Sequence, residues 1–157
     1  MEPSDGNPYG FHFARRNLPH MGEFGACYMV TWRLHAGQAP LTGAERQLVC
    51  DALRHFDKER YWLGAYVVMD DHVHAIVQPR GDRELSSILH AWKSFTANRL
   101  QRLHRRTGCV WQDESYDRVI RSPDDLVEKA SYILTNPVRR WLDTDEYAYA
   151  GIGSLDA

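Results

Sequence analysis

The sequence of 157 residues lacks the features that define several large classes of protein. It has only three cysteines, Cys27, Cys50 and Cys109, at wide spacings and without a Cys-x-x-Cys pair. This excludes a disulfide scaffold and a cysteine-based zinc site, and it favours a reducing compartment. No run approaches the roughly 18 apolar residues that cross a bilayer, and the N-terminus has neither a basic stretch nor an apolar core. We therefore expect a soluble, cytoplasmic protein.

The sequence also lacks an excess of charge of either sign. Lys plus Arg total 19 and Asp plus Glu total 21, which gives a net charge of -2. This balance argues against a nucleic-acid partner, because phosphate binding usually requires a basic surface. The charges are unevenly distributed, however. Residues 88–106 carry basic side chains and no acidic one, whereas the tail from Asp143 onward carries acidic side chains and no Lys or Arg. Because the basic residues are concentrated in one segment, the net charge does not exclude a nucleic-acid partner.

Hydrophobic periodicity and turn chemistry predict seven elements in the order β-α-β-β-α-β-α. The expected strands cover 26–34, 62–69, 72–78 and 116–121, and the expected helices cover 42–60, about 83–106, and 122 to about 137. Capping patterns begin the first and last helix, and we expect the last helix to stop near Pro137, because the residue before proline avoids the α region. This order predicts an α+β fold, with a ferredoxin-like or RRM-like antiparallel sheet and packed helices.

Composition divides the chain into three segments. Residues 1–24 are rich in Gly, Pro and Asn and predict an N-terminal arm, which carries Arg15 and Arg16. Residues 25–142 hold all the expected elements and predict one folded domain. Residues 143–157 predict an acidic C-terminal tail.

One histidine pair is placed for metal binding. His72 and His74 lie two residues apart in an expected strand, so their side chains share a face with Cα atoms about 6.5–7 Å apart. Two imidazoles at this separation can bind one metal ion. The alternative is two histidines on a solvated strand face, since this spacing is common by chance.

The expected last helix carries a candidate nucleophile. Its apolar residues centre near Ala130, and Tyr132 falls on the opposite, polar side. Asn136 follows one turn later on the same side and offers an amide oxygen as a possible third metal ligand. The alternative is that Tyr132 packs over a neighbouring surface or marks an interface.

Basic and aromatic residues alternate through the second half of the chain. Cations that follow a phosphate backbone, with aromatic rings for stacking, are what single-stranded nucleic acid needs. The alternative is a solvated helix face, although such faces usually mix both signs. The predicted nucleic-acid contacts are Arg15, Arg16, Lys93, Arg99, Arg102, Arg105, Arg106, Trp111, Arg118 and Arg121.

The sequence resembles a known protein family. The stretch VVMDDHVH at 67–74 looks like the histidine motif (HUH) of single-tyrosine transposases, and the bacterial REP-associated tyrosine transposases give the best match. Four other stretches support the resemblance: LPH at 18–20, WQ at 111–112, YDRVIR at 116–121 and YILTNPVR at 132–139. The resemblance covers roughly residues 15–142. Each motif alone is a weak signal, but the five motifs in this order and spacing are specific to the family.

The resemblance implies a metal-dependent enzyme that nicks and rejoins single-stranded DNA near palindromic, REP-like hairpins, as a monomer or a homodimer. On this basis His72 and His74 hold the metal, Asn136 is a further ligand, and Tyr132 forms a 5′-phosphotyrosine link. Imidazole with oxygen ligands suits Mg²⁺ or Mn²⁺. The alternative is a non-catalytic module or repressor that binds single-stranded DNA or RNA hairpins on a retired transposase fold.

The sequence departs from the family pattern in the expected hairpin turn and at the end of the expected last helix, and its tail lacks the aromatic, serine-rich ending of the family. Asp70 and Asp71 stand where family members commonly have Pro-Asn, and Arg140 and Trp141 stand where they have Ala-Gly. Aspartate is compatible with a tight turn, so the hairpin prediction holds. The first change also puts two carboxylates beside the expected metal site.

Overall fold

The computed structural model describes residues 26–141 and 147–156. Within them the strands are β1 (Tyr28–Leu34), β2 (Tyr61–Val68), β3 (His72–Pro79), β4 (Trp111–Val119) and β5 (Ala150–Ile152). The helices are α2 (Gly43–His55), α3 (Leu85–His104), α4 (Pro123–Arg140) and the short 3-10 helix η2 (Ser154–Asp156). The predicted arm at 1–24, with Arg15 and Arg16, lies outside the described residues.

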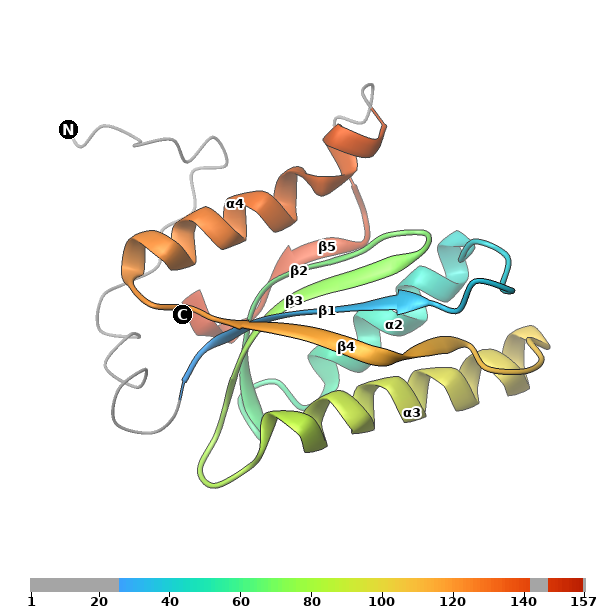
Figure 1. The fold of residues 1–157 in the computed structure, drawn as a ribbon, viewed down its shortest axis with the longest axis horizontal. Helices are drawn as coiled ribbons and strands as arrows, with labels where there is room; N and C mark the ends of the chain where they lie inside the picture. The colour runs from blue at the N-terminus through green and yellow to red at the C-terminus, as the bar shows by residue number, and fades with distance from the viewer. Residues whose placement is uncertain (1–25, 142–146, 157) are drawn as a thin grey trace.

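The strands form one antiparallel sheet in the order β4-β1-β3-β2-β5. The first four strands have the order and directions of a ferredoxin-like sheet, in which the β1-α2-β2 and β3-α3-β4 units interleave. Helices α2 and α3 lie on one side of the sheet, and α4 lies on the other (Figure 1). The α+β, ferredoxin-like prediction is confirmed.

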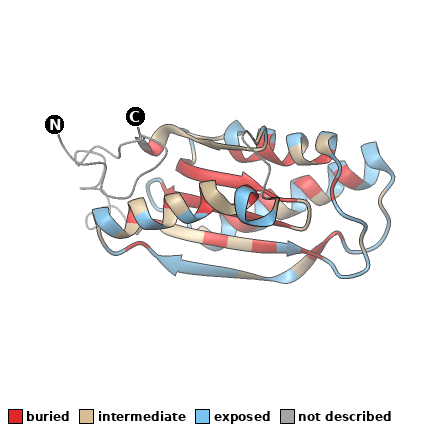
Figure 2. Cartoon of the chain, turned by 90° about the horizontal axis from the view of Figure 1, so that it is seen from above, coloured by how far each residue is buried: buried red, intermediate tan, exposed pale blue. Residues whose placement is uncertain are grey.

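The sheet separates two apolar cores. On one side Trp32 of β1 stacks on Trp92 of α3, with ring centroids 5.8 Å apart. On the other side Ile76 of β3 packs with Ile133 of α4. The residues of β3 are buried along its whole length, whereas most of the edge strand β4 is exposed (Figure 2). Because strand side chains alternate, the even-numbered residues of β3 face α4.

Helix α4 extends beyond its predicted end. It continues through Pro137 to Arg140, although proline cannot donate a helical hydrogen bond. Side chains support the turn before the proline: the carbonyl oxygen of Tyr132 accepts hydrogen bonds from Arg139 at 2.7 Å and from Thr135 at 3.2 Å. The prediction that the helix stops near Pro137 is wrong, and the additional turn carries Arg140 to the β2–β3 hairpin.

Two strands also differ from their prediction. Strand β4 begins at Trp111, five residues earlier than expected, because an edge strand can expose polar residues that give no apolar alternation. Strand β5 lies inside the segment predicted as an acidic tail and pairs with residues 65–67 of β2. Its three residues are too few for a periodic signal.

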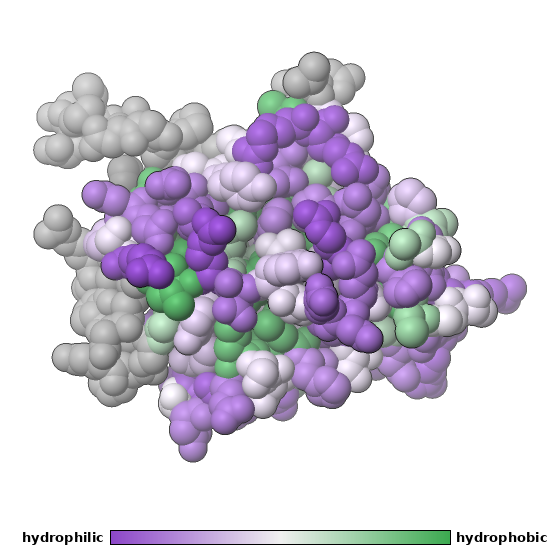
Figure 3. Space-filling model, viewed as in Figure 1, coloured by the Kyte–Doolittle hydropathy of each residue, from purple (hydrophilic) through white to green (hydrophobic). Residues whose placement is uncertain are grey.

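The face seen in Figure 3 is mostly hydrophilic, with apolar side chains in small patches between the elements. Within the described part of the chain, no helix combines the length and apolar character that a bilayer span requires.

Candidate active site

Both predicted metal-binding histidines lie at the start of β3, on the side of the sheet that faces α4. Their ring centroids are 4.7 Å apart, and the two rings are close to perpendicular. Both residues are buried, His72 at 8% exposure and His74 at 5%. The strand spacing therefore brings the two imidazoles together, as predicted.

Each imidazole is held through its Nδ1 atom. Nδ1 of His72 donates to a carboxylate oxygen of Asp71 at 2.7 Å, and Nδ1 of His74 lies 2.7 Å from the hydroxyl of Thr31 on β1. Among the described residues, no hydrogen bond is formed by Nε2 of either ring. A fixed Nδ1 and a free Nε2 is the arrangement that orients histidine ligands toward a metal ion.

His74 is electrically neutral at physiological pH. Burial is the main cause, and the positive charges of His72, Arg33 and Arg139 act in the same direction, so that the pKa of His74 falls to about 3. A neutral imidazole has the free lone pair that metal coordination requires.

Tyr132 projects from α4 over this pair. Its ring lies 5.6 Å from the ring of His74, centroid to centroid, and in an edge-on orientation. The guanidinium of Arg139 covers the same ring at 4.3 Å. The tyrosine is 46% exposed, so its hydroxyl is open to a substrate. Helix α4, which carries Tyr132, begins at Pro123. The side chain of Ser122 caps its first turn and so fixes where the helix starts.

A cleft of about 790 Å³ opens beside Tyr132 and His74. Strands β1 and β4 form its other walls, and each contributes an exposed arginine, Arg33 and Arg118. Tyr116 of β4 also lines the cleft, and its hydroxyl donates to Glu114 at 3.0 Å. That hydrogen bond and the charge of Glu114 raise the pKa of Tyr116. The cleft combines a tyrosine, an imidazole and basic side chains.

Asn136 lies on α4 between two fixed contacts. One turn before it, Tyr132 meets His74; one turn after it, Arg140 pairs with Asp70 in the β2–β3 turn. Positions four apart share one side of a helix, so Asn136 faces the same strand end as these two residues. The half-buried amide forms no hydrogen bond with any described residue.

The donor set fits an open metal site. Residues 26–141 and 147–156 contain no cluster of three or more His, Cys, Asp or Glu side chains, so the two imidazoles need oxygen ligands to complete a coordination sphere. A site with protein ligands on one side only is typical of catalytic rather than structural ions.

Comparison with known proteins agrees with this arrangement. The family profile described as "Transposase IS200 like" matches residues 28–125, which is more than half of the chain. The chain belongs to this family. The segment that matches the family profile includes the histidine pair and both strands of the cleft, and it ends seven residues before Tyr132.

Individual relatives extend the likeness of this IS200-like protein. It is 25% identical over 117 residues to the REP-associated tyrosine transposase of Escherichia coli K12, covering 73% of this chain and 68% of that protein. Its fold matches a REP-associated tyrosine transposase bound to a REP hairpin, with a TM-score of 0.67, 21% identity and 85% of each chain covered. A candidate transposase from Deinococcus radiodurans R1 matches with a TM-score of 0.51 and 20% identity, over 69% of this chain and 88% of that one.

One of the predicted nucleic-acid contacts, Arg118, lines the cleft itself. Arg121 is exposed in the connection between β4 and α4. Arg33 and Arg139 lie closer to the histidines and were missed from the sequence. The alternation of β1 could have indicated Arg33, because it is two residues from Thr31 and therefore on the histidine side.

Three other predicted contacts have structural roles in this family member. Lys93 donates to the carbonyl oxygens of Gln112 and Asp113 in β4, and burial lowers its pKa. Trp111 is only 5% exposed, because its ring packs in the core. Arg106 is bound in an ion pair with Glu45. Trp111 and Arg106 thus have little surface to offer a nucleic acid, whereas Lys93 is half-buried and held against β4.

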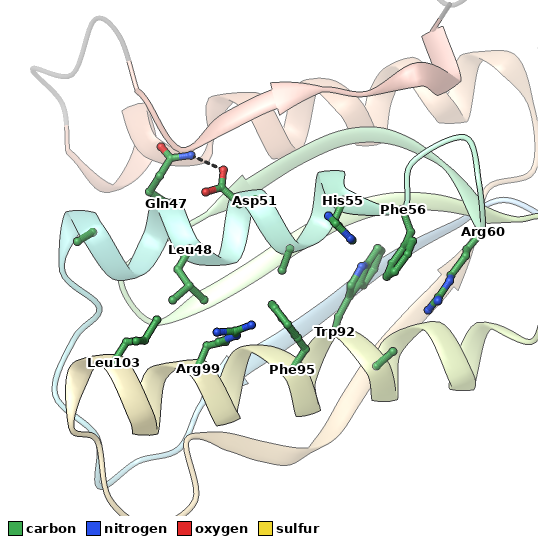
Figure 4. Close-up of a pocket in the computed structure, with 13 residues that line it drawn as sticks. Gln47, Leu48, Asp51, His55, Phe56, Arg60, Trp92, Phe95, Arg99 and Leu103 are labelled. Atoms are coloured by element: carbon green, nitrogen blue, oxygen red, sulfur yellow. Dashed lines mark hydrogen bonds between the residues drawn. The ribbon is translucent and has the colours of Figure 1, made fainter.

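The other predicted contacts among the described residues lie on the far side of the sheet, on or next to α3. Arg99 lines a second cleft of about 740 Å³ between α2 and α3, where its guanidinium lies 5.1 Å from the ring of Phe95 (Figure 4). Arg102 and Arg105 are exposed near the end of α3. Helix α3 thus does not present one continuous basic stripe, and its free arginines face away from His74.

Proposed function

We propose that this chain is a metal-dependent nuclease and strand transferase that cleaves single-stranded DNA near REP-like hairpins through a 5′-phosphotyrosine link at Tyr132. The position of the Tyr132 ring, 5.6 Å from His74 in a cleft with basic walls, carries the proposal. Membership of the IS200-like family and the likeness to a transposase bound to a REP hairpin support the substrate class.

In this reaction the phenol oxygen of Tyr132 attacks the scissile phosphorus, and the bond from phosphorus to the 3′ oxygen breaks. The phenol loses its proton as the new ester forms, and the departing oxygen becomes a 3′-hydroxyl. His72, His74 and Asn136 would hold a divalent cation, which would supply Lewis-acid stabilisation of the phosphate charge. Arg33 and Arg118 bind phosphates beside the scissile one, because both line the cleft.

A covalent-adduct assay tests this function. The protein is incubated with Mn²⁺ and an end-labelled hairpin oligonucleotide that carries a single-stranded flank, and the products are separated on a denaturing gel. We expect labelled DNA bound covalently to the protein, and loss of this band with excess EDTA. Tight hairpin binding without an adduct, across varied flanks and with both Mn²⁺ and Mg²⁺, would instead establish a non-catalytic hairpin-binding module.

The face on which DNA lies can be found from the salt dependence of binding. We expect Arg33→Ala and Arg118→Ala each to weaken hairpin affinity and to reduce the slope of log K against log salt by about one, as the loss of one phosphate contact predicts. Arg102→Ala is the matched control on the other side of the sheet and is expected to leave the slope unchanged. A reduced slope in Arg102→Ala and Arg105→Ala, with no change in the cleft variants, would place the DNA against α3.

A further inference from the structure

The turn between β2 and β3 is joined to the end of α4 through two carboxylates. The guanidinium of Arg140 lies 3.0 Å from one oxygen of Asp70 and 3.5 Å from one oxygen of Asp71. The other oxygen of Asp71 accepts the Nδ1 hydrogen bond of His72 at 2.7 Å. A continuous chain of polar contacts therefore runs from Arg140 through Asp71 to His72.

We propose that Asp71 is a positioning residue that fixes the ring of His72 with Nε2 directed at the catalytic cation, and that Arg140 holds Asp71 in place. This role rests on the proposed function, because it assumes that His72 binds a metal ion. A carboxylate accepts hydrogen bonds but donates none when ionised, so Asp71 keeps the proton of His72 on Nδ1 and leaves Nε2 free.

The two histidines have different partners. Asp71 places a carboxylate oxygen 2.7 Å from Nδ1 of His72. His74 is held differently, by the neutral hydroxyl of Thr31. Among the described residues, His72 has a carboxylate partner and His74 does not. The orientation of the His72 ring therefore depends on the contact between Asp71 and Arg140.

Asp71 and Arg140 are 69 positions apart in the chain, yet they meet in the structure. The contact needs the long side chain of the arginine, because Arg140 reaches Asp70 and Asp71 in the turn from the end of α4.

The pairing also fastens the helix that carries Tyr132. Helix α4 contacts β3 through Tyr132 on His74, and eight residues later it contacts the β2–β3 turn through Arg140. At 1.5 Å per residue these contacts are about 12 Å apart along the helix. Arg140 thus gives α4 a second contact with the hairpin that carries the histidine pair.

Metal affinity and histidine tautomer test this role together. Mn²⁺ binding to the full chain is measured by calorimetry without DNA, and the His72 tautomer is measured by ¹⁵N NMR without metal. We expect Asp71→Ala to weaken Mn²⁺ binding by about 10–100-fold, the usual cost of losing such a partner, and to shift the His72 proton from Nδ1 toward Nε2. Arg140→Ala is expected to weaken binding by less, because Asp71 can still accept the hydrogen bond.

Two further variants make the result specific. Asp71→Asn retains an oxygen that accepts from Nδ1, so it is expected to keep the Nδ1 tautomer and to restore most of the affinity that alanine loses. Asp82→Ala removes an exposed carboxylate from the distant β3–α3 loop and is expected to change neither measurement. Thermal melting of each variant checks that the fold is retained.

The outcomes separate this role from the proposed function. If wild type binds Mn²⁺ and forms the adduct while Asp71→Ala and Arg140→Ala keep wild-type affinity and tautomer, the positioning role alone is overturned. If wild type neither binds Mn²⁺ nor forms an adduct, the proposed function fails with it.

Discussion

Replacing Tyr132 by phenylalanine is expected to abolish the covalent DNA adduct and to reduce cleavage by at least about 10³-fold, because it removes the oxygen that attacks the phosphorus in the proposed reaction. The change removes a single hydroxyl, which forms no hydrogen bond with the described residues. The ring retains its edge contact with His74 and its cover by Arg139. Hairpin affinity and thermal stability should therefore remain close to those of wild type.

Tyr116→Phe is the matched control for this experiment. Tyr116 lines the same cleft and is as exposed as Tyr132, but it lies on β4 and its hydroxyl is engaged by Glu114. We expect the adduct to persist in Tyr116→Phe, as seen by the same denaturing gel. An adduct that survives Tyr132→Phe and disappears in Tyr116→Phe would reverse the assignment of the nucleophile, and one that survives both would exclude a tyrosine of this cleft.

The fold was largely predictable because its signals are local. The run of β-branched and aromatic residues in β1, the two-residue turn at Asp70 and Asp71, and the caps at Thr42 and Ser122 each depend on a few neighbouring residues. The end of α4 was not predictable in this way, because proline usually ends a helix, whereas α4 continues for three residues beyond Pro137. Strand β5 requires the free edge of β2, which only the tertiary structure provides.

The site was predictable to the extent that spacing determines it. A two-residue interval on a strand and a four-residue interval on a helix place His72 with His74, and Tyr132 with Asn136, whatever the rest of the chain does. That the tyrosine approaches the histidines depends on how α4 crosses the sheet, and this is a tertiary property.

The roles of the basic residues were harder to predict, because the partner of a charge is often distant in sequence. Lys93 is held by backbone oxygens about 20 residues away, and Arg106 is paired with a carboxylate 61 residues away. Both look like free cations when α3 is read alone. In the structure, only three arginines of the predicted basic helix are exposed. Arg33 and Arg118 at the cleft are therefore the better candidates for phosphate contacts.

The ion pair between Arg106 and Glu45 gives the largest expected effect on stability. Glu45 is only 2% exposed, and its carboxylate accepts from Nε of Arg106 at 2.5 Å and from Nη2 at 2.7 Å. Arg106 also donates to the carbonyl oxygens of Ala39 and Pro40, so it joins the end of α3 to the loop before α2. Removing one partner of a buried pair leaves the other charge without compensation.

We expect Arg106→Ala to lower the free energy of unfolding by about 3–5 kcal/mol, as measured by urea denaturation at pH 7. Arg102→Ala is the matched control, since this exposed arginine in the last turn of α3 should change stability by less than about 0.5 kcal/mol. A loss below about 1 kcal/mol in Arg106→Ala would show that the pair contributes little to the fold.

The pH dependence of stability provides an independent measure of the same pair. The hydrogen bond from Arg106 is the main cause that lowers the pKa of Glu45 from 4.5 to about 2 in the folded protein. The folded state thus binds the proton more weakly than the unfolded state, so the stabilisation is complete above about pH 4.5 and is lost as the pH falls toward 2. A difference of this size corresponds to roughly 3 kcal/mol. Glu45→Gln should therefore be less stable than wild type at pH 7, with a gap that narrows below pH 4.5; parallel stability curves down to pH 2 would contradict the assignment.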